Sequence, residues 1–146
     1  MNLKQLCKAL GELACAQQLV NFSAAGASLA ELNPLQIEFY PVFYIIPSGV
    51  HTVLENTTRY GLVLYYIDRL IQDNYNSIDV FSSSVENLKN IVIGAKGIEG
   101  VVGVQDGYTI RNFMPEKMND RVCGAYAEVQ IEVKNDSTCY EENQEI

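Results

Sequence analysis

The stretch from Tyr60 to Ile67 constrains the fold more than any other part of this chain. Its sequence, YGLVLYYI, is apolar at both sets of alternating positions, with Leu62 and Leu64 on one side and Val63 and Tyr65 on the other. Successive side chains of a strand point to opposite faces of a sheet, so other parts of the protein have to cover both faces here. We therefore expect residues 60–67 to form a central strand.

A helix is expected to follow, from Ser77 to about Ile93. Its apolar residues are spaced alternately three and four apart, which places them on one side of a helix: Ile78, Phe81, Val85, Leu88 and Val92. Ser77 is suited to cap the first turn, and Asp79 lies where the helix dipole favours a negative charge. The apolar side is predicted to pack on the sheet.

The last strand is the clearest single element. Between Val122 and Lys134 the odd-numbered positions are apolar: Cys123, Ala125, Ala127, Val129, Ile131 and Val133. Glu128, Gln130 and Glu132 alternate with them, so one face of this strand is predicted to be core and the other polar. Residues 101–110 are a second, weaker strand candidate.

Two further elements complete the expected fold. Leucines at helical spacing predict a first helix from about Asn2 to Val20. The β-branched and aromatic residues of Ile37–Ile46 predict a strand, and Pro41, which cannot donate to a ladder, places that strand at a sheet edge or at a bulge.

These elements predict a single α+β domain over residues 1–134. We expect an antiparallel sheet of about four strands, packed by the N-terminal helix and a second central helix. Residues 135–146 are acidic and lack periodicity, so they are expected to form a C-terminal tail.

Composition and charge narrow the function. The chain has 146 residues, 48% of them apolar, which suits one domain with a substantial core. Ten Lys and Arg against eighteen Asp and Glu leave a net charge of −8, which argues against a protein that grips the phosphate backbone of nucleic acids. The N-terminal sequence lacks the unbroken apolar core of a signal peptide, and no apolar run is long enough to span a bilayer. We therefore expect a cytosolic chain with no membrane partner.

Residue types that carry catalysis or bind metals are few and scattered. His51 is the only histidine, which excludes a multi-histidine metal site or a histidine-based triad within one chain. The four cysteines contain no close pair of the kind that zinc sites use, so reduced thiols are expected. Asp68 and Asp73 fit a strand end and a turn better than an acid–base pair. We therefore expect no catalytic residue, no cofactor, no metal and no enzymatic activity.

The segment from Pro47 to Arg59 is predicted to be a long hairpin connection that projects from the domain. It contains Val50, Val53 and Leu54, which a solvated loop would not need. We therefore predict that it contacts other chains. The candidate interface residues come from this segment and from the polar face of the last strand: Val50, His51, Val53, Leu54, Arg59, Glu128, Gln130 and Glu132.

The order of elements also resembles a known family. The motifs that carry the resemblance are Tyr40-Pro41-Val42, Asp68-Arg69-Leu70 with Asp73 and Asn74, and the sequence NDRVCG at residues 119–124. Together they resemble small structural proteins of tailed bacteriophages, notably the crAss-like phages of Bacteroidales, which form rings in the head-to-tail connector and are similar to tail terminators. The resemblance extends from the first helix to about Lys134. Three serines at residues 82–84 and the longer acidic tail depart from the family pattern, which leaves open which ring of the connector is concerned.

The resemblance implies an α+β, tail-terminator-like subunit whose neighbours close a ring through sheet edges and protruding hairpins. It also implies a virion protein, assembled in the host bacterial cytoplasm, that contacts the portal and adjacent connector or tail proteins. Genome DNA would pass through the lumen without specific binding, because an acidic surface keeps the duplex from adhering. The polar face of the last strand would line that channel or contact a neighbouring ring.

An alternative from another class remains open. The chain would then be a small cytosolic ligand-binding or regulatory domain with an aromatic pocket. The residues that would line such a pocket are Phe39, Tyr40, Phe43, Tyr44, Tyr60, Tyr65 and Tyr66.

Overall fold

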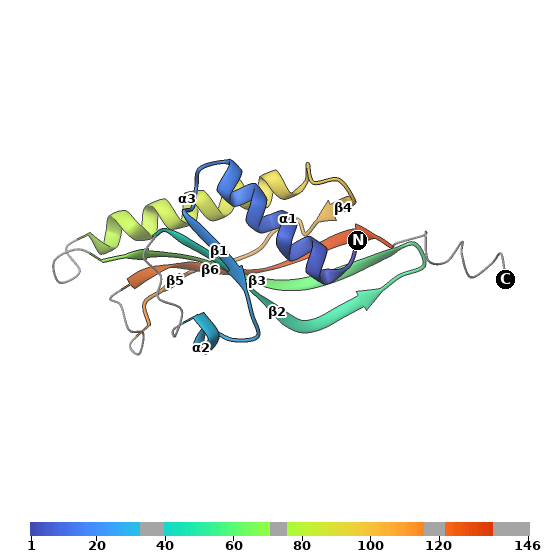
Figure 1. Cartoon of the computed structure of the whole chain (residues 1–146), viewed down its shortest axis with the longest axis horizontal. Coiled ribbons are helices and arrows are strands. Elements are labelled where there is room, and N and C mark those ends of the chain that lie inside the picture. The colour runs from blue at the N-terminus through green and yellow to red at the C-terminus, as the bar shows by residue number, and fades with distance from the viewer. Residues whose placement is uncertain (33–39, 71–75, 116–121, 136–146) are drawn as a thin grey trace.

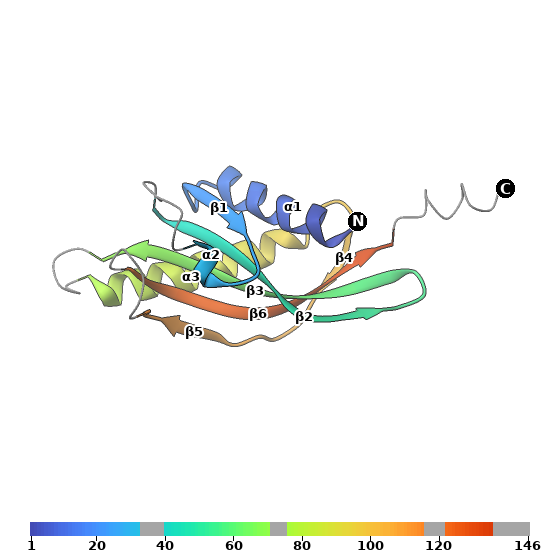
Figure 2. The same ribbon diagram turned by 60° about the horizontal axis from the view of Figure 1, so that its bottom comes forward.

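The computed structural model describes residues 1–32, 40–70, 76–115 and 122–135. Along the chain its elements are α1 (Leu3–Ala16), β1 (Phe22–Ala25), α2 (Leu29–Leu32), β2 (Val42–Val53), β3 (Thr57–Arg69), α3 (Ser77–Ala95), β4 (Val101–Val104), β5 (Ile110–Phe113) and β6 (Val122–Lys134). The six described strands form one sheet in the order β1-β2-β3-β6-β4, in which β4 pairs with the last part of β6 and β5 with its first part. Helices α1 and α3 cover one face, and the short α2 lies against the other (Figures 1 and 2).

The fold class is α+β, as the sequence predicts, but the sheet differs from the expected one. It has six described strands where about four were expected, and it is mixed, because β1 runs parallel to β2 while the other pairs are antiparallel. Periodicity did not reveal β1, because four residues of sequence FSAA are too short and too small to form a recognisable pattern. Within the described residues, no helix combines the length and the apolarity needed to cross a membrane.

Strands β3 and β6 form the centre of the sheet. They are paired along their whole lengths, from Thr57 opposite Lys134 to Arg69 opposite Val122. The prediction of a central strand is confirmed, because β3 lies between β2 and β6. On its helix-facing side Leu62, Leu64 and Tyr66 are buried and Tyr60 is half-buried, whereas on the other side Val63 and Tyr65 are only half-buried. The helix-facing side is therefore the more completely covered one.

The alternation predicted for the last strand is confirmed. Its odd-numbered residues are buried under α1 and α3, whereas Glu128 and Gln130 are exposed on the helix-free face. Strands β4 and β5 both pair with β6, so the outer edge of β6 is occupied along much of its length.

Helix α1 is shorter than the predicted Asn2–Val20. It begins after Asn2, whose side chain accepts a bond from the Gln5 amide while the Gln5 side chain bonds the Asn2 amide, a capping box. It ends at Ala16. Gln18 has a φ of 59°, which lies outside the right-handed helical region, so the helix cannot continue through this residue. Val20, the expected last residue of this helix, is buried but belongs to the segment that follows α1.

Helix α3 begins at Ser77, as predicted, but its buried side is rotated from the predicted one. Ile78 is 74% exposed. The buried positions are Val80, Ser84, Leu88, Ile91, Val92 and Ala95. Ser84 can be buried because its hydroxyl donates to the Val80 carbonyl at 2.6 Å. The predicted Ser77 cap is wrong too, since the N-cap position is Asn76 and no side-chain cap bond forms there.

The rotation of α3 follows from its neighbours. The helix packs against β3, β6 and α1 together, so its buried surface lies between the sheet and α1. A polar contact joins β3, α3 and the segment after α1: the Tyr66 hydroxyl donates to the Leu19 carbonyl at 2.7 Å, and the Asn87 amide donates to the Tyr66 hydroxyl at 2.8 Å. Burial raises the pKa of the Tyr66 phenol to about 12, which keeps it protonated as this contact requires.

The expectation for Pro41 is corrected. Strand β2 begins after it, at Val42, and is flanked by β1 and β3 over Val42–Ile45, so it is not an edge strand there. The register shift of this strand lies further along, between Pro47 and His51. Residues 37–39 of the predicted strand lie outside the described residues.

Candidate assembly surfaces

The segment predicted as a long connection is mostly strand. Strand β2 continues to Val53 and β3 begins at Thr57, so the turn is only residues 54–56. The Leu54 amide donates to the Thr57 carbonyl at 2.9 Å across this turn. Because β1 covers β2 only as far as Ile45, the rest of β2 is an edge strand, whereas its partner β3 stays paired with β6 up to Thr57. The β2–β3 hairpin and its turn form one end of the sheet (Figures 1 and 2). We call residues 47–59 the hairpin arm.

The apolar residues predicted to contact other chains are exposed on the hairpin arm. Val50 is 71% exposed, Val53 is 77% exposed and Leu54 at the turn is 38% exposed. Side chains of this kind in contact with water carry an unfavourable free energy that a partner surface would remove. The arm is thus both apolar and accessible.

His51 contributes to the shape of the arm. Its ring lies edge-on to the Tyr60 ring, 5.2 Å between centroids, and its Nδ1 accepts a bond from the Gly61 amide at 3.3 Å. At Gly61 an added Cβ would meet the Ser48 hydroxyl and lie 2.8 Å from the Val50 carbonyl oxygen. The two strands therefore approach closely at the register shift, which gives the arm a defined local structure.

The turn of the arm is also attached to the end of β6. The Asn135 amide side chain donates to the carbonyls of Leu54 and Glu55 at 3.4 and 3.5 Å, and the Thr58 hydroxyl donates to Asn135 Oδ1 at 2.6 Å. Asn135, the first residue of the predicted tail, is thus bound to the arm. Residues 136–146 lie outside the described part of the chain.

The remaining predicted residues meet on the helix-free face. Arg59 lies opposite Glu132 in the β3–β6 register, and its Nε is 2.8 Å from Glu132 Oε1. Gln130 lines a depression next to this ion pair, and with Glu128 it lines a second one that includes Arg111. Arg59 therefore contacts the last-strand residues and is not part of the tip of the arm. Because Arg59 and Arg111 lie beside the acidic residues, this face is polar but not uniformly acidic.

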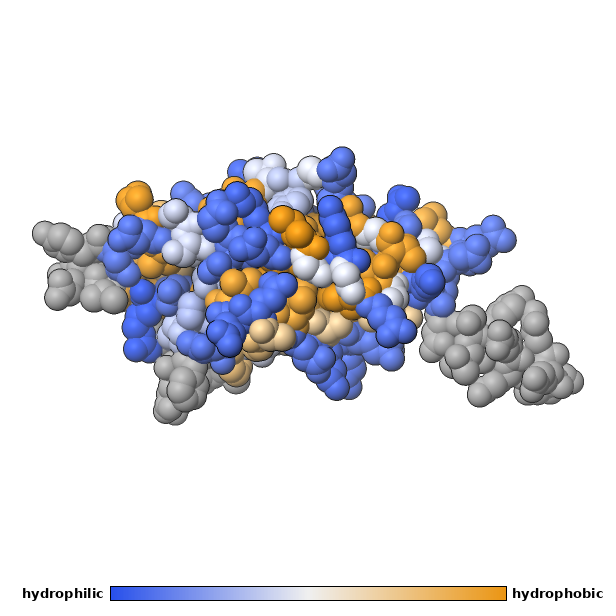
Figure 3. Space-filling model, turned by 90° about the horizontal axis from the view of Figure 1, so that it is seen from above, coloured by the Kyte–Doolittle hydropathy of each residue, from blue (hydrophilic) through white to orange (hydrophobic). Residues whose placement is uncertain are grey.

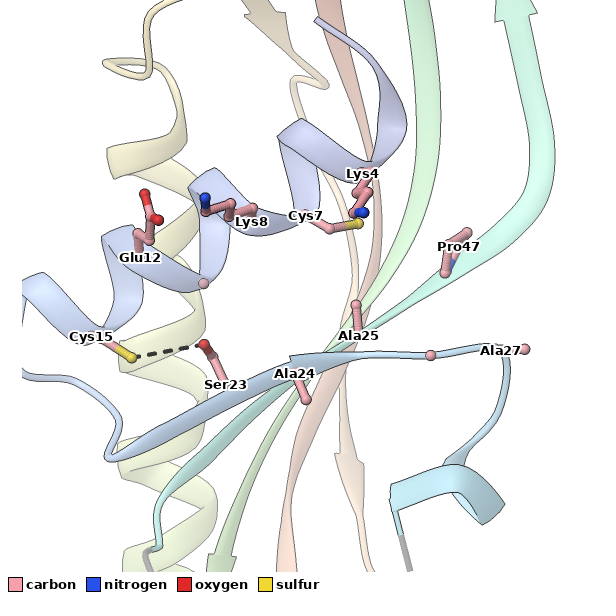
Figure 4. A pocket seen from close by; sticks show the side chains of 12 residues that line it. Lys4, Cys7, Lys8, Glu12, Cys15, Ser23, Ala24, Ala25, Ala27 and Pro47 are labelled. Atoms are coloured by element: carbon pink, nitrogen blue, oxygen red, sulfur yellow. Dashed lines mark hydrogen bonds between the residues drawn. The ribbon is translucent and has the colours of Figure 1, made fainter. Parts of the chain in front are cut away.

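A groove that sequence reasoning did not identify lies between α1 and β1. It has a volume of about 710 Å³ and is lined by Lys4, Cys7, Lys8, Gly11, Glu12, Cys15, Ser23, Ala24, Ala25, Gly26, Ala27 and Pro47. Figure 4 shows the charged side chains of α1 above the small residues of β1 and the segment after it. From the helix side, small and apolar residues reach the surface between charged ones near the middle of the molecule (Figure 3).

Small residues create this groove. An added Cβ at Gly11 would lie 2.7 Å from the Ser23 hydroxyl, so glycine lets α1 approach β1 closely there. Cys15 donates weakly to the Ser23 hydroxyl at 3.8 Å. The signal in the sequence is the run SAAGA at residues 23–27, whose side chains are too small to fill the space beneath a helix.

Cys7, Cys15 and Cys123 are unpaired, and the fourth cysteine, Cys139, lies outside the described residues. Burial raises the pKa of the Cys7 thiol, so it is protonated at neutral pH. Among the residues that the structure describes, no three His, Cys, Asp or Glu side chains gather as a metal site would require.

The aromatic residues of the alternative interpretation do not share one site. Phe43 and Tyr66 belong to the core under the helices, whereas Tyr44 and Tyr65 lie in a second cluster on the opposite face. There Tyr65 stacks on Tyr126 with centroids 5.3 Å apart. Phe39 lies outside the described residues. The aromatic side chains are therefore divided between the cores on the two faces of the sheet.

Of the two carboxylates considered in the sequence, Asp73 lies outside the described residues. Asp68 is half-buried at the end of β3, and burial raises its pKa, opposed by the Arg69 amide that donates to it at 2.8 Å. This is the strand-end position that the sequence predicts.

No model of a known protein family matches this chain, and no curated protein shows significant similarity to it.

Proposed function

We propose that this protein is a non-enzymatic structural subunit of a tailed-phage virion that forms a homo-oligomeric ring in the head-to-tail connector. The observation that carries this proposal is the hairpin arm, whose β2 strand presents Val50 and Val53 to solvent at the edge of the sheet. The ring, the portal and the neighbouring connector or tail proteins as partners, and the location in the virion come from the resemblance of the sequence motifs to such proteins.

Assembly through the arm has a physical rationale. The arm keeps its structure through backbone pairing, so binding would order few additional residues, and little conformational entropy would be lost. Beyond Ile45 no described strand covers the outer edge of β2, and exposed strand edges favour pairing between chains. These properties suit a rigid element that contacts a neighbouring subunit.

The first prediction concerns this contact. We expect the purified protein to associate into a discrete oligomer, and Val53→Asp to weaken association at least about tenfold, since a charge would have to be buried in the contact. Sedimentation velocity across a concentration series measures this. Ile93→Asp is the matched control, because Ile93 is 62% exposed on α3, away from the arm. A wild-type protein that stays monomeric, or equal effects of the two substitutions, would contradict the proposal.

The second prediction concerns DNA, which we propose passes through the ring without docking. With a net charge of −8, the protein has few cations to release counterions, so we expect no measurable duplex binding at physiological salt. Fluorescence anisotropy of a labelled duplex measures it, and a titration at low salt is the control for electrostatic attraction. Binding that persists at physiological salt would contradict a passive channel.

A further inference from the structure

We propose that the groove between α1 and β1 receives the hairpin arm of a second copy of this chain. The inference rests on the proposed self-assembly and adds the receiving surface, which is remote from the arm tip. It follows from the chemistry of the groove, from the charges beside each surface and from the length of the arm.

The groove matches the arm in shape and polarity. Its floor consists of small residues, Gly11 and the segment Ala24–Ala27, and Cys7 and Pro47 add apolar surface. A space of about 710 Å³ accommodates several aliphatic side chains, and such concave apolar sites bind partners with matching apolar groups. Val50 and Val53 are the most exposed aliphatic residues on the described strands, ahead of Val102 on β4, which is 44% exposed.

The charges beside the two surfaces are complementary. Lys4 and Lys8 follow one another along the solvent side of α1 at the rim of the groove, with Glu12 one turn further. Neither lysine forms an ion pair with a described residue. The arm carries the exposed Glu55 in its turn. Docking would bring this carboxylate toward the lysines.

The tip of the hairpin arm cannot reach the groove of its own chain, although Pro47 at the base of the arm lines that groove. The turn begins seven residues further along a paired strand, which at about 3.3 Å per residue is about 23 Å away. The contact must therefore join different surfaces of two copies. Such head-to-tail contacts repeat from copy to copy and close into a ring when the rotation between copies allows it.

Native cysteines in the groove provide a direct test. In a Cys139→Ser background, Val53→Cys should be joined by a short bismaleimide to Cys7 or Cys15 of the next copy. Each copy carries both groups, so a ladder of dimers and higher species is expected on a denaturing gel. Ile93→Cys is the matched control and should give no ladder above the background, since it is as accessible as the arm but lies on α3.

Removing the groove thiols tests the partner site. Val53→Cys combined with Cys7→Ser and Cys15→Ser should lose the ladder, whereas peptide mass mapping of the intact ladder should identify the introduced arm cysteine joined to one of the two groove cysteines. Oligomers whose arm cysteine joins any other site would overturn the groove as receiver while leaving self-assembly in place. A protein that is monomeric in every variant would overturn both.

A charge exchange provides a test without cross-linking. Lys4→Glu with Lys8→Glu should weaken association at least about tenfold, and adding Glu55→Lys should restore part of it. All three side chains are exposed, so circular dichroism should show an unchanged fold. No loss of association, or a small molecule retained in the groove by native mass spectrometry, would overturn docking of the arm there.

Discussion

Gly124→Ala is expected to destabilise this protein by about 3 kcal/mol or more, at or above the upper end for overpacking. A Cβ at Gly124 would meet the Tyr66 carbonyl oxygen and would lie 2.8 Å from its carbonyl carbon and 3.1 Å from Ile67 Cα. All these atoms belong to the backbone of β3, so no side chain can rotate away. The two central strands would have to separate where their pairing forms the middle of the sheet.

Gly103→Ala is the matched control. It is also a glycine in a strand paired with β6, but an added Cβ there has nothing within 4 Å, so its effect should stay within about 0.5 kcal/mol. Urea denaturation of both variants, followed by circular dichroism, measures the difference. Similar midpoints for Gly124→Ala and the wild type would show that the strands do not approach as described.

Leu88→Ala should cost about 2 to 5 kcal/mol of unfolding free energy. Leu88 is fully buried in the main core, where α3 packs on β3 and β6, and truncation would leave a cavity that this close packing cannot fill. Chemical denaturation of the variant and the wild type measures the loss.

Ile78→Ala tests the orientation of α3. The sequence spacing places Ile78 and Leu88 on the same side, but Ile78 is mostly exposed, so its truncation should cost less than about 0.5 kcal/mol. If Ile78→Ala and Leu88→Ala lowered the unfolding free energy by similar amounts, the orientation predicted from the sequence spacing would be right and the observed orientation would be wrong. Asn87 is unsuitable as a neutral control, because its amide donates to the Tyr66 hydroxyl.

The candidate assembly surface was only partly predictable. The exposed valines of the arm stand out in the sequence because they lie in a polar segment, and the structure places them on an extended hairpin. The sequence did not reveal that Arg59 pairs with Glu132, because residues 73 apart meet only through the register of β3 and β6. The groove was missed for a similar reason, since it requires α1 and β1 to be placed side by side.

The sequence by itself determined those elements whose alternation of apolar and polar residues depends on packing against a single neighbouring layer. In β6 one face is dry and the other wet, so strict alternation is enough to identify its core residues. The apolar β3 likewise had to lie inside a sheet. These patterns can be read from one segment alone, because the apolar or polar character of each side chain depends only on whether its own face of the strand is exposed to water.

Only the tertiary structure decided how those elements face one another. Helix α3 contacts both the sheet and α1, so two directions of packing compete for one apolar side, and the result leaves Ile78 outside and Ser84 inside. The parallel pairing of β1 and the length of the arm also depend on partners distant in sequence. The free energy of such contacts depends on both of the surfaces that meet. The sequence of one segment describes only one of these surfaces, so it does not show which partner the segment will contact.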